Sequence, residues 1–124
     1  MKGEFYNMSK IPTKINKIID EFVHGVNEIL GNRAKKIILY GSYARGDYNK
    51  NSDIDIMILT DLTDKEIIEY RNKIWDYAYD IEFDNNFDIE LSPLVKNIDK
   101  FNYWLEALPF YMNIQKEGVV LSES

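Results

Sequence analysis

Two carboxylates stand two residues apart in Asp53-Ile54-Asp55, and ten residues separate them from the pair Gly41-Ser42. Side chains at i and i+2 of a strand point to the same face, so Asp53 and Asp55 are expected side by side. Adjacent carboxylates repel each other, and Mg²⁺, which takes hard oxygen ligands together with phosphate oxygens, would stabilise the pair. Gly41 and Ser42 offer backbone N–H groups and a hydroxyl to a phosphate if a helix begins there. The stretch therefore predicts metal ligands next to a phosphate-binding turn.

The flanking segments predict strands that place these residues at the edge of a cleft. Lys35–Tyr40 is a nearly continuous apolar run, as expected of a short strand covered on both faces. Gly46–Ser52 is rich in turn-forming residues, and Asp53–Thr60 is the second predicted strand. On the face that carries the carboxylates, Met57 and Leu59 follow. The carboxylates thus occupy one strand end, where a cleft-edge site needs its ligands.

Four other segments predict helices, and a fifth is a last short element. Apolar residues at helical spacing predict a helix from about Ser9 to Leu30. The capping box Thr63-Asp64-Lys65-Glu66 predicts a second helix that runs to about residue 82. Further helices are expected over about 97–107 and from Pro109 to Gly118. Val119–Leu121 is interpreted as a final short strand or a tail.

A second carboxylate pair lies in the predicted third strand. Phe87–Ser92 alternates strictly between apolar and polar residues, which predicts a strand with its apolar side chains inward and with Pro93 at its end. The opposite face carries Asp88 and Glu90, again at i and i+2. The whole chain therefore predicts an α+β fold, a small mixed sheet with packed helices.

The motif Gly41-Ser42 with Asp53-Ile54-Asp55, at this spacing and between two strands, resembles the signature of the DNA polymerase beta nucleotidyltransferase superfamily. Within it, the short chain is most similar to the minimal nucleotidyltransferases of the MNT antitoxin type, which partner HEPN-domain toxins. This resemblance implies that Asp53 and Asp55 bind two Mg²⁺ ions, and that Gly41 and Ser42 hold the triphosphate of ATP. It further implies a third carboxylate from a neighbouring strand, which bridges a metal and assists as base.

Two positions stay open within that scheme. Asp88 and Glu90 both face the right way for the third carboxylate; Asp88 is preferred because it lies nearer the strand start, although alternation alone does not separate them. Arg45 lies four residues beyond Gly41, and its guanidinium could fork onto phosphate oxygens. An ordinary surface arginine is the alternative for Arg45.

Length and charge limit the class of protein. The 124 residues predict one domain over 1–124, and the absence of cysteine excludes disulfides and thiolate metal sites. A net charge of −6 argues against a nucleic-acid partner. Neither a signal-type core nor a run long enough for a membrane span is found, so a cytoplasmic location without membrane contact is expected.

Three functions are compatible with the motif. By resemblance, the first is an adenylyltransferase that moves AMP from ATP to a hydroxyl, a tyrosine of a HEPN toxin, and so acts as an antitoxin. The second is a small-molecule nucleotidyltransferase of the aminoglycoside type, for whose substrate-binding structure this chain leaves little room. The third is a toxin-binding module without catalysis, which the intact Gly-Ser and Asp-x-Asp motif disfavours.

Overall fold

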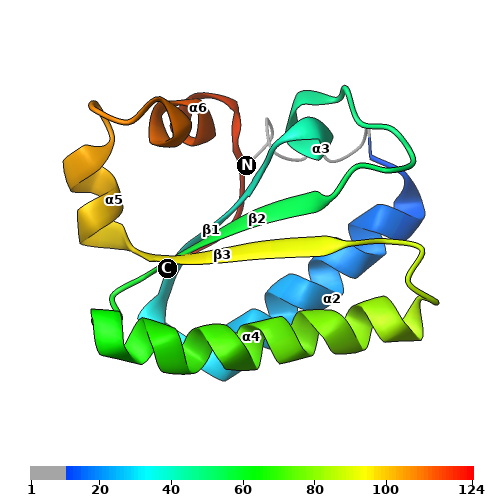
Figure 1. Cartoon of the computed structure of the whole chain (residues 1–124), viewed down its shortest axis with the longest axis horizontal. Helices are drawn as coiled ribbons and strands as arrows, with labels where there is room; N and C mark the ends of the chain where they lie inside the picture. Colours follow the sequence, from blue (N-terminus) through cyan, green and yellow to red (C-terminus); the bar gives the residue numbers. More distant parts are fainter. Residues whose placement is uncertain (1–10) are drawn as a thin grey trace.

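The computed structural model describes residues 11–124, which form a mixed β-sheet with helices on both faces (Figure 1). The strand order is β3-β2-β1-β4; β1 runs antiparallel to β2 and β4, whereas β2 and β3 are parallel. The strands are β1 Ala34–Tyr40, β2 Ile54–Thr60, β3 Leu91–Asn97 and β4 Val119–Glu123. The helices are α2 Thr13–Leu30, α3 Ser42–Arg45, α4 Asp64–Asp84, α5 Ile98–Trp104 and α6 Pro109–Glu117, with a 3₁₀ turn over Gly31–Arg33.

Alternation along the strands divides the apolar side chains between two cores. The larger core lies between the sheet and helices α2 and α4, which run along one face of the sheet (Figure 1). The smaller core lies on the opposite face, under α5 and α6. The larger core includes Ile19, Phe22, Ile37, Leu39, Ile56 and Ile74; the smaller includes Ile38, Met57, Leu59, Phe101 and Ile114. Asp55 therefore shares its face with Met57 and Leu59, as the sequence predicts.

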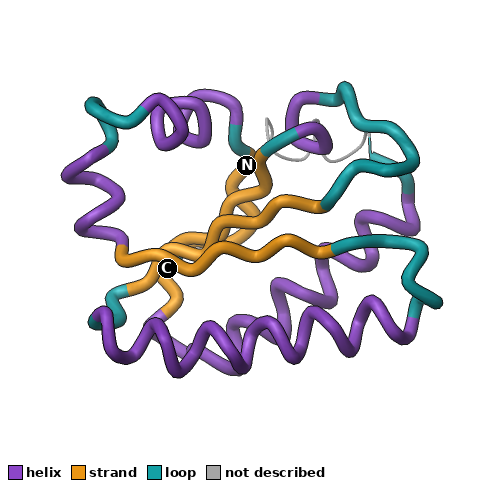
Figure 2. Tube along the Cα trace, in the orientation of Figure 1, coloured by secondary structure: helices purple, strands orange, loops and turns teal. Residues whose placement is uncertain are grey.

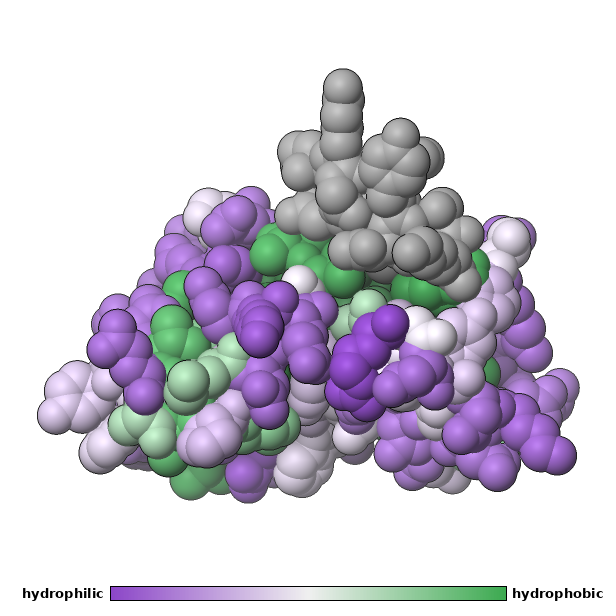
Figure 3. Space-filling model, turned by 90° about the horizontal axis from the view of Figure 1, so that it is seen from above, coloured by the Kyte–Doolittle hydropathy of each residue, from purple (hydrophilic) through white to green (hydrophobic). Residues whose placement is uncertain are grey.

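The face of the molecule that carries α3, α5 and α6 is mostly hydrophilic (Figure 3). Its hydrophobic residues are grouped toward the end with α5 and α6. Exposed large side chains at that end belong to Tyr103, Trp104, Leu108, Phe110 and Met112. Within residues 11–124, no helix is both long enough and apolar enough to cross a membrane.

Most predicted elements are confirmed. The strands predicted over Lys35–Tyr40 and Asp53–Thr60 correspond to β1 and β2. The predicted capping box is present at the start of α4, with both of its hydrogen bonds between Thr63 and Glu66. The predicted start of the first helix at Ser9 lies outside the described residues. Val119–Leu121 belongs to β4, which pairs with β1, so its interpretation as a strand holds.

The predicted third strand, Phe87–Ser92, is wrong in position. Asn86 and Phe87 have left-handed backbones, with φ of 57° and 58°, and this turn leaves Phe87 54% exposed. The strand begins only at Leu91 and passes through Pro93 instead of ending there. Among the described strands β3 is at the edge of the sheet, where a missing proline N–H removes no ladder hydrogen bond. The helix expected over about 97–107 is also shorter, Ile98–Trp104.

Candidate active site

The candidate site lies at the end of the sheet where β1 leads into α3 and where β2 and β3 both begin. Figure 2 shows the loops before β2 and β3 at the same end as α3. The register pairs Tyr40 with Asp55 and Ile54 with Leu91. The topology therefore brings the Gly-Ser turn, the Asp-x-Asp pair and the residues before β3 to one end, as expected for a site at strand ends.

Gly41 sits directly against Asp55. Its backbone, with φ 76° and ψ −156°, lies in a region essentially restricted to glycine. A Cβ atom at Gly41 would also overlap the Oδ2 atom of Asp55. The turn can approach this carboxylate because Gly41 has no side chain.

Ser42 opens α3 just behind that glycine. No side chain caps the start of this helix. The N–H groups of Ala44 and Arg45 already donate to the carbonyl oxygen of Gly41, so those of Ser42 and Tyr43 are the donors that the beginning of α3 has to offer an anion. The half-buried Ser42 adds a hydroxyl at the same place.

The two aspartates interact as the sequence predicts. Burial raises the pKa of the half-buried Asp55, and the charge of Asp53 raises it further, while the charge of Arg45 acts in the opposite direction. Burial, followed by the nearby charge of Asp55, also raises the pKa of Tyr40 to about 12. The site thus concentrates negative charge that a cation would relieve.

Of the two candidates for the third carboxylate, the structure brings only Glu90 to this pair. A side-chain hydrogen bond with Asp53, and then the charge of Asp53, raises the pKa of Glu90. Asp88 instead lies 3.9 Å from the Nζ atom of Lys14, with 66% of its side chain exposed. The preference for Asp88 depended on a strand that began at Phe87, so it loses its basis when β3 begins at Leu91.

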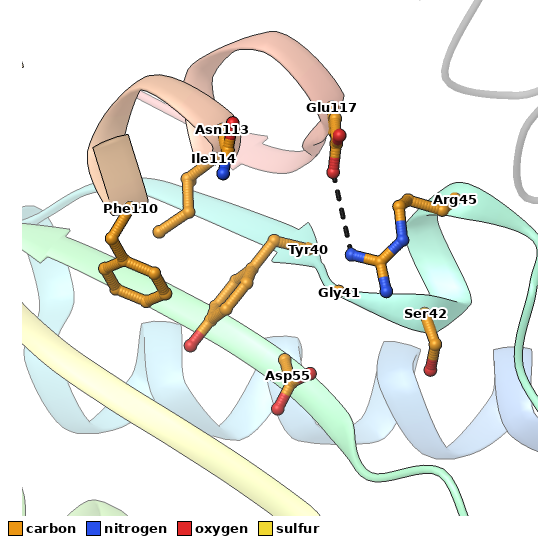
Figure 4. A pocket seen from close by; sticks show the side chains of 9 residues that line it. All are labelled: Tyr40, Gly41, Ser42, Arg45, Asp55, Phe110, Asn113, Ile114 and Glu117. Carbon is orange, nitrogen blue, oxygen red and sulfur yellow. Dashed lines mark ion pairs between the residues drawn. The ribbon is translucent and has the colours of Figure 1, made fainter. Parts of the chain in front are cut away.

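A cavity of about 560 Å³ opens beside Asp55 (Figure 4). One wall comes from the end of β1 and from α3, and the facing wall comes from α6. Its lining consists of Tyr40, Gly41, Ser42, Arg45, Asp55, Phe110, Asn113, Ile114 and Glu117. The sequence did not indicate the α6 residues, because they follow the motif by more than fifty positions and carry no motif of their own.

Arg45 projects into this cavity and is held by two carboxylates. Its Nε atom donates to Asp47 at 3.2 Å, and its Nη1 atom lies 3.6 Å from Glu117 of α6. The hydrogen bond with Asp47 is the main cause of its raised pKa. Figure 4 shows the guanidinium reaching across from α3 toward α6. The positively charged guanidinium of Arg45, with its several N–H donors, therefore faces the cavity beside Asp55.

The donor chemistry at this end of the sheet fits a divalent cation. Asp53, Asp55 and Glu90 supply hard carboxylate oxygens, and the lack of a side chain at Gly41 lets Oδ2 of Asp55 lie against the turn. Among residues 11–124, no three acidic or histidine side chains form a ready-made metal cluster. Ligands for a metal would therefore come from the two adjoining pairs, Asp53 with Asp55 and Asp53 with Glu90.

A mixed sheet that brings a Gly-Ser turn against an Asp-x-Asp pair defines a nucleotidyltransferase-type site. The family model for the nucleotidyltransferase domain matches residues 15–121, and the chain belongs to this family. It is 35% identical over 105 residues to a protein of Methanocaldococcus jannaschii assigned as a protein adenylyltransferase. That match covers 85% of this chain and 95% of the relative.

Solved structures share the fold at low sequence identity. A crystal structure from Sulfolobus solfataricus, assigned as a nucleotidyltransferase, superposes with a TM-score of 0.51 at 20% identity, covering 86% of this chain and 78% of the other. A toxin–antitoxin structure with AMP-PNP gives a TM-score of 0.50 at 18% identity, covering 84% and 73%. Both confirm the nucleotidyltransferase fold.

Proposed function

We propose that this chain transfers AMP from MgATP to a hydroxyl of a partner protein, a tyrosine of a HEPN-domain toxin, and thereby neutralises the toxin. Family membership supports nucleotidyl transfer, and the relative assigned as a protein adenylyltransferase supports a protein acceptor. The observation that carries the proposal is the contact between the Gly41 turn and the Asp55 carboxylate. In this proposal the turn binds phosphate and the carboxylate binds the metal.

In this proposal the turn and α3 hold the triphosphate. The hydroxyl of Ser42 and the first N–H groups of α3 donate to phosphate oxygens. Arg45 adds a planar guanidinium, which binds phosphate with two parallel hydrogen bonds. Because Asp47 and Glu117 already bind Arg45, a phosphate has to compete with these two carboxylates.

The transfer step balances as a substitution at the α-phosphorus. The acceptor oxygen forms a bond to the α-phosphorus, and the bond from that phosphorus to the oxygen bridging the α- and β-phosphates breaks. Pyrophosphate leaves, and the hydroxyl proton passes to a carboxylate. We assign that role to Glu90, the carboxylate before β3 that interacts with Asp53.

Mg²⁺ held by Asp53, Asp55 and Glu90 would neutralise charge on the triphosphate and lower the pKa of the acceptor hydroxyl. The chain's own contribution is to keep these carboxylates at neighbouring strand starts and to hold the turn against Asp55. Gly41 performs the second task, because any other residue would place a Cβ atom where Oδ2 of Asp55 lies.

The choice of partner rests on charge and on the resemblance of the Gly41–Asp55 motif to MNT antitoxins. The chain carries a net charge of −6, which would steer a basic partner toward it. An acceptor would approach through the cavity beside Asp55, whose lining residues among 11–124 come from β1, β2, α3, α6 and the turn at Gly41.

Intact-mass measurement of the toxin tests the proposal. After incubation with this protein, ATP and Mg²⁺, the toxin should gain about 329 Da, the mass of AMP less water, or a small multiple of it. The Asp53→Ala variant should bind the toxin without changing its mass. If the wild-type protein protects cells while the toxin mass stays constant, the binding-module function is correct. Transfer to an aminoglycoside but not to protein would establish the small-molecule alternative.

A further inference from the structure

One of the three arginines in the chain has no acidic partner among residues 11–124. Arg33 binds Asp61 and Glu66, and Arg45 binds Asp47 and Glu117. Arg71 forms no ion pair with any carboxylate of residues 11–124, and its buried Nε atom has no hydrogen-bond acceptor there. Leaving a buried charged donor unpaired is costly, and a protein with a net charge of −6 has carboxylates to spare. This arrangement indicates that the partner of Arg71 lies outside residues 11–124.

Arg71 lines a second cavity, of about 450 Å³, with further cations around it. Lys96 of β3 also lines it and, like Arg71, forms no ion pair within residues 11–124. Lys100 of α5 lies at the same cavity but is bound to Asp64 at 2.6 Å. Two unpaired, half-buried cations therefore converge on one hollow of an otherwise acidic protein.

The walls of this cavity are apolar and aromatic. Ile67 and Ile68 of α4 lie about one turn before Arg71, and Val95 of β3 joins them. Trp104 of α5 and Tyr111 of α6 add two rings. The start of α4, the end of β3 and α5 come together at one end of the sheet (Figure 1). Residues of these elements and Tyr111 of α6 line the second cavity, and none of them lines the cavity beside Asp55.

We propose that this second cavity binds a small organic anion with a planar ring. Arg71 and Lys96 bind its phosphate or carboxylate group, because a guanidinium and an ammonium are the donors suited to such oxygens. The ring packs against Trp104 and Tyr111. The guanidinium of Arg71 lies 4.8 Å from the centre of the Trp75 ring, and this cation–π contact fixes the position of the Arg71 side chain. The volume is within the range of small-molecule sites.

Intrinsic fluorescence can report binding directly, because the only two tryptophans of the chain are Trp75, which contacts Arg71, and Trp104, which lines the cavity. We expect saturable changes on titration with phenyl phosphate or with benzoate; comparing the two shows which anionic group is preferred. Benzyl alcohol, which has the ring without the charge, should give no saturable change. The prediction does not depend on adenylyl transfer.

Variants separate this cavity from the one beside Asp55. Arg71→Ala and Lys96→Ala should each weaken binding about tenfold or more, because each removes a charged hydrogen-bond donor. Arg45→Ala, which alters the other cavity, should leave the fluorescence titration unchanged. If circular dichroism shows that Arg71→Ala does not fold, the fluorescence titration of Lys96→Ala decides whether this cavity binds the anion. Absence of saturation with either anion, an equal response to benzyl alcohol, or undiminished binding by the variants would overturn the proposal.

Discussion

Replacing Gly41 by alanine is the sharpest single test of the site geometry. With φ 76° and ψ −156°, Gly41 occupies a region where an L-residue costs about 1–3 kcal/mol. For a chain of this length, 1 kcal/mol changes Tm by roughly 3–6 °C, so Gly41→Ala should lower Tm by roughly 3–18 °C. The new Cβ atom also overlaps Oδ2 of Asp55, so the carboxylate has to move. A displacement of about 1 Å can reduce a rate about hundredfold, and we expect that loss in AMP transfer.

Gly31→Ala is the matched control. Gly31 also has a positive φ, 59° with ψ −134°, but a Cβ atom there meets nothing within 4 Å. This variant should lose a comparable amount of Tm in thermal denaturation and keep the wild-type transfer rate. Equal activity of Gly41→Ala and wild type, or an equal loss of activity in both variants, would refute the role of Gly41 as the residue that lets the turn lie against Asp55.

Three further predictions concern the third carboxylate, the pH dependence of stability and the start of α4. Glu90→Gln should slow AMP transfer about hundredfold or more, whereas Asp88→Asn should change it less than about twofold; the reverse order of effects in initial-rate assays would contradict our assignment. Hydrogen bonds from Arg33 lower the pKa of Glu66 from 4.5 to about 2, so their stabilisation is complete above pH 4.5 and is lost as the pH falls toward 2. Glu66→Gln should therefore flatten the dependence of Tm on pH in that window, and an unchanged slope would show that this pair does not contribute. Thr63→Ala removes the capping box and should lower the free energy of unfolding by about 1 kcal/mol in urea denaturation; an unaltered midpoint would count against the cap.

Local patterns were sufficient to predict the first half of the site. The i, i+2 spacing of Asp53 and Asp55 sets their common face, because side-chain direction alternates along any strand. Gly41 was identified from its position after an apolar run, and the structure adds the reason that only glycine fits against Asp55. The capping box at Thr63 was equally local, since its two hydrogen bonds join residues three apart.

The third strand and the second half of the site depend on tertiary context. Strict alternation at Phe87–Ser92 predicts a strand, but the chain turns through two left-handed residues before it pairs with β2. Pro93 is a strand terminator only in a central position, and the edge position of β3 cannot be known from one sequence. The α6 wall, including Glu117 opposite Arg45, likewise depends on how a distant helix packs.

Isotopic labelling of the phosphates of ATP is the most direct test of the claim that this chain transfers AMP to the toxin. The toxin is incubated with this protein, Mg²⁺ and ATP labelled either in the α-phosphate or in the γ-phosphate. Nucleotidyl transfer predicts that the α-label becomes covalently attached to the toxin and that the γ-label is released in pyrophosphate, in equal amounts. Attachment of the γ-label to the toxin, or release of pyrophosphate without attachment of the α-label, would contradict the proposed function.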